Sequence, residues 1–173
     1  MSLALQRQAW ATSNDRLVAD TKVLVISVIV VTGDRDLSAS LDIAALKQRI
    51  VHHVNSEVTT AGRNLIVFDI SQFASPPPNI SLGEVLNAWV RIDLARVPVD
   101  DARNAVAGAV SVEFTRQEFD PKTVTATLTN ALSTAPMTLF VASGASDLQS
   151  KCDEAAIQQV QEAVIAPYLA SNQ

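Results

Sequence analysis

The stretch Thr123-Val-Thr-Ala-Thr-Leu-Thr129 places threonine at every second position, with small or apolar residues in between. A period of two is typical of a β-strand that has one packed face and one solvated face. Residues 110–115 show the same alternation just upstream, and Asp120 and Pro121 between the two runs favour a reversal of the chain. The sequence therefore predicts an antiparallel hairpin over residues 109–131.

Composition limits the classes of protein to consider. The chain has 173 residues, of which 48% are hydrophobic and only 5% aromatic. This length suits one domain, and the core must consist mainly of valine, isoleucine, leucine and alanine, a mixture that favours a sheet over a helix bundle. Cys152 is the single cysteine, so no disulfide can form within the chain.

Charge and hydropathy bear on partners and location. The net charge of −5 makes nucleic acid an unlikely direct high-affinity partner, because a phosphate backbone is repelled. The start of the chain lacks the basic and apolar regions of a secretory signal peptide, and the longest apolar run, 23–31, is too short to span a bilayer. We expect a protein of the cytoplasm, or of a virion assembled there, without a membrane partner.

Two apolar runs, 22–31 and 64–70, flank a segment with helical periodicity at 41–58. Ser40 is the predicted N-cap of this helix and Gly62 its C-terminal stop. The first run is almost continuous valine and isoleucine, which predicts a strand buried on both faces. Together the three segments predict a parallel βαβ unit.

The rest of the chain adds strands and a second helix. Residues 81–97 begin with a capping-box pattern and then alternate, which predicts a short helical turn followed by a strand. A further short strand is expected at 137–142, and a helix at 147–165, opened by Ser146 and limited by Pro167.

The predicted fold class is α+β, with a mixed, largely antiparallel sheet of about five or six strands and two main packing helices, 41–58 and 147–165. Residues 1–20 form an N-terminal arm or short helix, and residues 21–173 form a single α+β domain.

Acidic residues follow both strands of the predicted βαβ unit. If these strands are parallel neighbours, Asp34, Asp36, Asp69 and Ser71 meet at one sheet edge, where oxygen ligands suit Mg²⁺. A Mg²⁺-dependent enzyme using the three aspartates is therefore one alternative. The simpler interpretation is that aspartate is common in turns and at helix starts.

Other catalytic side chains form no coherent set. His52 and His53 are adjacent on a predicted helix, point about 100° apart and cannot both face one metal ion. We expect one to be exposed and the other to flank the core. Cys152 lies on the apolar stripe of the last helix, where it is expected to be buried and inert. No catalytic, cofactor-binding or metal-binding residue is predicted on this basis.

One family resemblance offers another alternative. The segment Leu65-Ile-Val-Phe-Asp-Ile-Ser71, followed by Asn79-Ile-Ser-Leu-Gly-Glu-Val-Leu86, resembles the strand–loop–helix core of STAS domains, the anti-sigma-factor antagonists. The resemblance covers residues 22–90. It implies a regulatory binding module in which Ser81, at a helix start, is a phosphorylated switch residue recognised by a kinase-like partner.

The leading hypothesis is a non-enzymatic, self-assembling structural subunit, such as a virion or phage-tail component. Its partners would be copies of itself and other assembly proteins. Trp89 is expected to pack internally, whereas Trp10, in an arm with few apolar neighbours, is expected to contact another subunit. The exposed edge of the hairpin should contribute as well. The predicted interface residues are Leu3, Leu5, Trp10, Thr123, Thr125 and Thr127.

Overall fold

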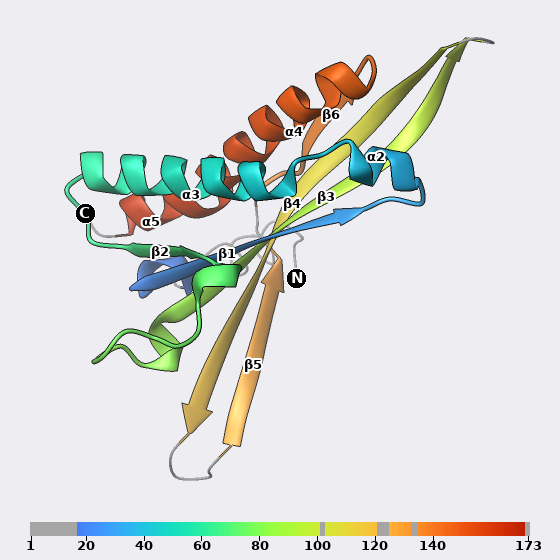
Figure 1. The fold of residues 1–173 in the computed structure, drawn as a ribbon. Helices are drawn as coiled ribbons and strands as arrows, with labels where there is room; N and C mark the ends of the chain where they lie inside the picture. Colours follow the sequence, from blue (N-terminus) through green and yellow to red (C-terminus); the bar gives the residue numbers. More distant parts are fainter. Residues whose placement is uncertain (1–16, 101–102, 121–124, 133–134, 172–173) are drawn as a thin grey trace, which may run out of the picture.

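A computed structural model describes residues 17–100, 103–120, 125–132 and 135–171. The described residues form one mixed sheet of six strands with helices packed on it, which confirms the predicted α+β class (Figure 1). Strand order is β2-β1-β3-β4-β5, and β6 also pairs with β4. The strands are β1 (Val23–Val31), β2 (Ile66–Asp69), β3 (Val85–Asp100), β4 (Arg103–Asp120), β5 (Thr125–Leu132) and β6 (Thr138–Ala142).

The direction of the strands changes at β3. Strands β2 and β3 both pair with β1 in parallel, whereas β4 pairs with β3, β5 and β6 in antiparallel fashion. The predicted βαβ unit and the hairpin are both confirmed. Strands β5 and β6 share one edge of β4, with β5 beside residues 113–120 and β6 beside residues 106–110. The two halves of β4 thus have different neighbours.

Helices α3 (Ile43–Thr60) and α4 (Ala145–Val160) lie on the same side of the sheet (Figure 1). The apolar stripe predicted from the sequence packs α3 on the sheet, because Leu46, Ile50, Val54 and Val58 are all buried. The main core lies between these helices and the sheet. Its fully buried members include Leu46, Ile50, Leu86, Phe114 and Leu148.

Helix boundaries near residue 40 differ from the prediction. Asp42, not Ser40, is the N-cap of α3, and its carboxylate accepts a hydrogen bond from the Ala45 N–H at 2.9 Å. Ser40 instead ends a short helix, α2 (Arg35–Ala39), that precedes α3. An aspartate and a serine are both good N-caps, so composition alone did not decide between them.

The last helix is longer than predicted. It starts at Ala145 and does not use Ser146 as its cap. It then passes through a π-helical segment, Gln161–Ile165, into α5 (Ala166–Ala170). Pro167 therefore does not end the helix. It lies in the first turn of α5, where the proline nitrogen needs no hydrogen-bond partner.

The loop between β2 and β3 explains why β1 is buried on both faces only in its first half. This loop contains two 3-10 turns, η1 (Ile70–Gln72) and η2 (Leu82–Glu84), so the predicted turn before β3 is confirmed. Phe68, Phe73 and Ile80 pack on a second, smaller core formed by the first part of the sheet. Beyond it, Ile29 and Val31 are 42% and 40% exposed, which corrects the prediction of a fully buried strand.

Candidate interaction surface

The side of the sheet opposite α3 and α4 is called the open face here. The register places successive rows of side chains on it. One row runs across four strands through Val31, Asp93, Ala109 and Leu139. The next row runs through Ala95, Ala107 and Val141, beyond the end of β1. Apolar side chains therefore dominate this part of the open face.

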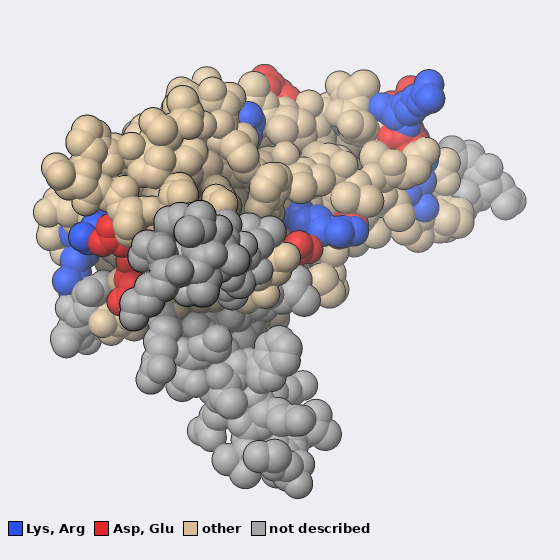
Figure 2. Space-filling model, turned by 90° about the horizontal axis from the view of Figure 1, so that it is seen from below, with Lys and Arg blue, Asp and Glu red and all other residues tan. Residues whose placement is uncertain are grey.

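We define the apolar patch as six residues of these two rows. They come from β1, β3, β4 and β6, and they are Val31, Ala95, Ala107, Ala109, Leu139 and Val141. Leu139 is 73% exposed and Val141 is 65% exposed, the two highest values among the large hydrophobic residues of the described chain. Seen from below the sheet, charged side chains form small, separate groups on a mainly uncharged surface (Figure 2).

Strand β6 lies at an edge of the sheet, since no described strand pairs with its outer side. Natural edge strands usually carry a charge, a proline or a bulge that prevents pairing with another chain. The sequence of β6, Thr-Leu-Phe-Val-Ala, has neither a charged residue nor a proline. The strand therefore presents an unprotected edge beside the apolar patch.

The face of β6 that points toward the helices packs in the core. Phe140 and Ala142 face the helices, and Ala142 is fully buried. At the start of the strand, the Gln159 side chain of α4 accepts hydrogen bonds from the backbone N–H and hydroxyl of Thr138 at 2.9 and 2.8 Å. Because these contacts fix the orientation of β6, Leu139 and Val141 point away from the helices and stay exposed.

Asp93 is the one charged residue in the two rows, and Arg91 balances its charge. The guanidinium of Arg91 donates to both carboxylate oxygens of Asp93, with Nε at 2.9 Å from Oδ2. This hydrogen bond, with the negative charges of Asp93 and Glu113, raises the pKa of Arg91. The pair is on the surface and neutral overall, so it interrupts the apolar patch without giving it a net charge.

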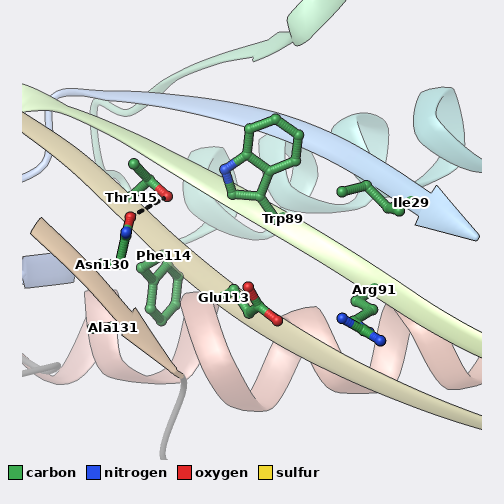
Figure 3. A pocket seen from close by; sticks show the side chains of 8 residues that line it. All are labelled: Ile29, Trp89, Arg91, Glu113, Phe114, Thr115, Asn130 and Ala131. Carbon is green, nitrogen blue, oxygen red and sulfur yellow. Dashed lines mark hydrogen bonds between the residues drawn. The ribbon is translucent and has the colours of Figure 1, made fainter. Parts of the chain in front are cut away.

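A cavity of about 510 Å³ adjoins the patch on the open face. Figure 3 shows Trp89 and Arg91 on one strand, with Glu113 and Thr115 on the next. The Thr115 hydroxyl donates to Asn130 of β5 at 3.2 Å. The complete lining is Ile29, Trp89, Arg91, Glu113, Phe114, Thr115, Asn130 and Ala131. An aromatic ring beside a few polar groups suits the contact of a side chain or an apolar ligand.

The position of Trp89 differs from the sequence prediction. It is half-buried and lines this cavity, whereas the sequence prediction had it packed internally. Its position is fixed by alternation on β3, where Ala88 and Val90 face the core instead.

The predicted interface residues are not tested by the structure. Leu3, Leu5, Trp10 and Thr123 lie outside the described residues. Thr125 and Thr127 belong to β5, paired with Asp120 and Glu118, but their side chains are not described. These assignments stay predictions. Sequence reasoning missed the patch on β6, and the signal available was the absence of charged residues from that strand.

The three aspartates proposed to hold Mg²⁺ do not meet at one sheet edge, although Asp34 lies beside Asp36 and Asp69 beside Ser71. Strand β2 ends at Asp69, which is opposite Ile26 in the middle of β1, so Asp34 lies well beyond it. Asp34 caps α2 and forms an ion pair with Arg96, whereas Asp69 pairs with Lys47 at 3.0 Å. No group of three metal-ligating side chains occurs among the described residues. The Mg²⁺-site hypothesis is therefore wrong for Asp34, Asp36, Asp69 and Ser71.

The environment of Ser81 also differs from what the STAS resemblance implies. Ser81 precedes one 3-10 turn and then β3, so no α-helix starts there. The Glu84 carboxylate accepts hydrogen bonds from the backbone N–H and hydroxyl of Ser81, at 2.9 and 3.0 Å. The Lys22 ammonium and these Ser81 donors lower the pKa of Glu84 to about 2. Ser81 stabilises a turn between strands, in place of the expected helix start.

The histidines and the cysteine are placed as predicted. His52 is exposed, and His53 is half-buried with its Nε2 atom 3.1 Å from the side-chain oxygen of Gln161. Cys152 is fully buried, and burial, with the nearby charge of Asp153, raises the pKa of its thiol to about 12. A thiol in this state is not a nucleophile at neutral pH.

Comparison with known proteins identifies no family. No protein-family model and no curated protein sequence matches the chain.

Within the described ranges, no helix combines the length and apolar character needed to cross a membrane.

Three solved structures are similar to the chain at a low level. A putative neuraminyllactose-binding hemagglutinin homolog from Helicobacter pylori is 10% identical, with 89% of this chain and 83% of that chain covered, at a TM-score of 0.40. The PelC dodecamer from Paraburkholderia phytofirmans is 10% identical, with 84% and 89% covered, at 0.39. The hypothetical protein CT253 from Chlamydia trachomatis is 14% identical, with 88% and 99% covered, at 0.43. Similarity at this level assigns no function to the chain.

Proposed function

We propose that this protein is a non-enzymatic structural subunit that assembles with copies of itself. The observation that carries the proposal is the exposure of Leu139 and Val141 on an unprotected edge strand beside other apolar side chains. Monomeric proteins rarely keep a contiguous apolar surface and an open strand edge in the same place.

Two physical contributions favour association at this surface. Covering the apolar patch removes hydrocarbon from water, at about 25 cal/mol for each Å² buried. Pairing at the outer edge of β6 satisfies backbone N–H and C=O groups and fixes the orientation of the partner. The compensated pair Arg91–Asp93 lowers the electrostatic penalty of bringing another chain close.

The side chains considered for catalysis from the sequence do not form one site among the described residues. Asp34 and Asp69 lie in different parts of the fold and each pairs with a cation, and the thiol is buried and protonated. The particular assembly proposed from the sequence is a virion or phage-tail component. Electron microscopy of the purified oligomer tests this finer proposal, because tubes, rings and closed shells are distinguished directly.

Light scattering over a concentration series tests the association itself. The wild type is expected to have the mass of a defined oligomer. Replacing Leu139 and Val141 together by lysine should shift the mass to that of the monomer, since both side chains are exposed and their loss costs the fold little. Leu82→Lys is the matched control, because Leu82 is 39% exposed on the η2 turn, away from the patch. A wild type that stays monomeric at every concentration would contradict the proposal.

A further inference from the structure

The chain contains a segment whose chemistry matches the apolar patch. Residues 1–16, outside the described residues, include Leu3, Leu5 and Trp10. In an extended segment, residues two apart point to the same side. Leu3 and Leu5 therefore have the same spacing as Leu139 and Val141 on β6.

Charge also favours contact between this segment and the rest of the chain. Residues 1–16 contain Arg7, Asp15 and Arg16, a net charge of +1. The whole chain has a net charge of −5, so residues 17–173 carry −5 − 1 = −6. A cationic apolar segment is thus attracted to an acidic body that presents an apolar surface.

The length of the segment indicates which copy it contacts. It leaves the described chain at Leu17, whose carbonyl accepts a hydrogen bond from Arg116 on the helix-covered face. Ala107, within the patch, is nine residues from Arg116 along β4, about 30 Å at roughly 3.3 Å per residue. Trp10 is seven residues from Leu17, and even a fully extended chain of that length spans only about 25 Å.

Within one molecule, the segment must also pass around the sheet to reach the open face. Trp10 therefore cannot reach the far row of the patch, Ala107 and Val141, on its own chain, even where Leu3 and Leu5 can. On a neighbouring copy, all three large apolar side chains can be buried at once. Burying the tryptophan adds substantially to the apolar contact, because aromatic side chains have the largest contact areas.

We propose that residues 1–16 of one copy dock on the apolar patch and the outer edge of β6 of a second copy. This inference rests on the proposed self-assembly and names its interface. The segment adds a strand next to β6, with Leu3 and Leu5 beside Leu139 and Val141. The cavity lined by Trp89 and Glu113 lies next to this position and receives the remainder of the segment.

Disulfide trapping between full-length chains tests the proposal. Leu5→Cys protein is mixed with Val141→Cys protein under mild oxidation, and the mixed cross-linked dimer is followed by mass. Native Cys152 does not interfere because it is fully buried. We expect the mixed dimer to form roughly ten-fold faster than in a mixture of Leu5→Cys with Leu82→Cys, since docking raises the effective concentration of the two thiols.

The double variant Leu5→Cys/Val141→Cys separates docking between copies from docking within one chain. A cross-linked monomer from dilute double variant, with no excess of mixed dimer from the mixture, overturns the inference and leaves the segment on its own chain. Equal rates at positions 82 and 141, in a wild type that light scattering shows to be oligomeric, also overturn it while the proposed function stands. A monomeric wild type contradicts both proposals.

Discussion

Gly108 of β4 and Phe140 of β6 are direct cross-strand neighbours, and the phenyl ring occupies the space that a side chain at position 108 would need. A Cβ atom built on Gly108 would lie 2.1 Å from Cζ of Phe140. The missing side chain thus lets the aromatic ring pack over β4 and holds β6, the strand that bears Leu139 and Val141, against the sheet.

Gly108→Ala should therefore destabilise the protein. The overlap with Phe140 forces the ring or β6 to move, and overpacking of this kind costs about 1–3 kcal/mol. Urea unfolding measures the loss. The double variant Gly108→Ala/Phe140→Ala should be more stable than the sum of the single changes predicts, because the clash is then absent. Additive effects would show that the two residues do not compete for the same space.

Ser27→Ala should increase stability. Ser27 lies in β1 with only 2% of its surface exposed, and its hydroxyl has no hydrogen-bond partner among the described residues. Burying an unpaired hydroxyl is unfavourable, so its removal should raise the free energy of unfolding by about 1 kcal/mol. Ser111→Ala is the control, since Ser111 is only half-buried. A larger loss of stability at position 27 than at position 111 would show that the Ser27 hydroxyl forms a stabilising hydrogen bond.

The sequence predicts those elements whose two faces differ in polarity. Helix α3 has one apolar stripe, and the segment around Val110, Val112 and Phe114 alternates with polar residues, so both elements and their buried faces follow from the pattern. Strand β6 has no such contrast, because Leu139 and Val141 are as apolar as Phe140 and Ala142. Which pair becomes exposed depends on where α4 packs, and no local pattern contains that information.

The wrong predictions about the candidate sites show a second limit of prediction from the sequence. The grouping of Asp34 with Asp69 assumed that β1 and β2 end together, but β2 stops opposite Ile26 while β1 continues to Val31. The relative length of two neighbouring strands depends on the loop that follows, here the segment 70–84 that folds over the first half of β1. Trp89 was misplaced for the same reason, since this loop leaves the second half of the open face uncovered.

Asp69→Asn should make the protein less stable at neutral pH and change its response to acid. Burial alone would raise the pKa of Asp69, but the Ser71 N–H and the Lys47 ammonium outweigh it and lower the pKa below 3.8. The folded state therefore binds this proton less readily than the unfolded state. The ionised carboxylate contributes stability above about pH 3.8 that is lost as the pH falls through the lowered pKa.

At pH 7 the Asp69→Asn variant should lose about 1.5–3 kcal/mol, the range for hydrogen bonds to charged groups. Thermal or urea unfolding from pH 7 to pH 2 measures the difference from wild type, which should shrink at the acidic end. Repeating the series in high salt tests the location of the pair, because a largely buried ion pair is screened weakly. A difference independent of pH would mean that the carboxylate is not stabilised in its charged form.

Cys152 should report on opening of the core between α4 and the sheet. Its thiol is fully buried and has a pKa raised to about 12, so at pH 8 roughly one molecule in 10⁴ carries the thiolate that reacts with alkylating reagents. We expect native protein to resist labelling for hours and unfolded protein to label at once.

Val141→Cys provides the matched comparison, because that position is 65% exposed. Its added thiol should react promptly in dilute protein and more slowly as the concentration rises, since assembly covers the apolar patch. Rapid labelling of Cys152 in the native wild type would show that α4 separates from the sheet far more often than this packing allows.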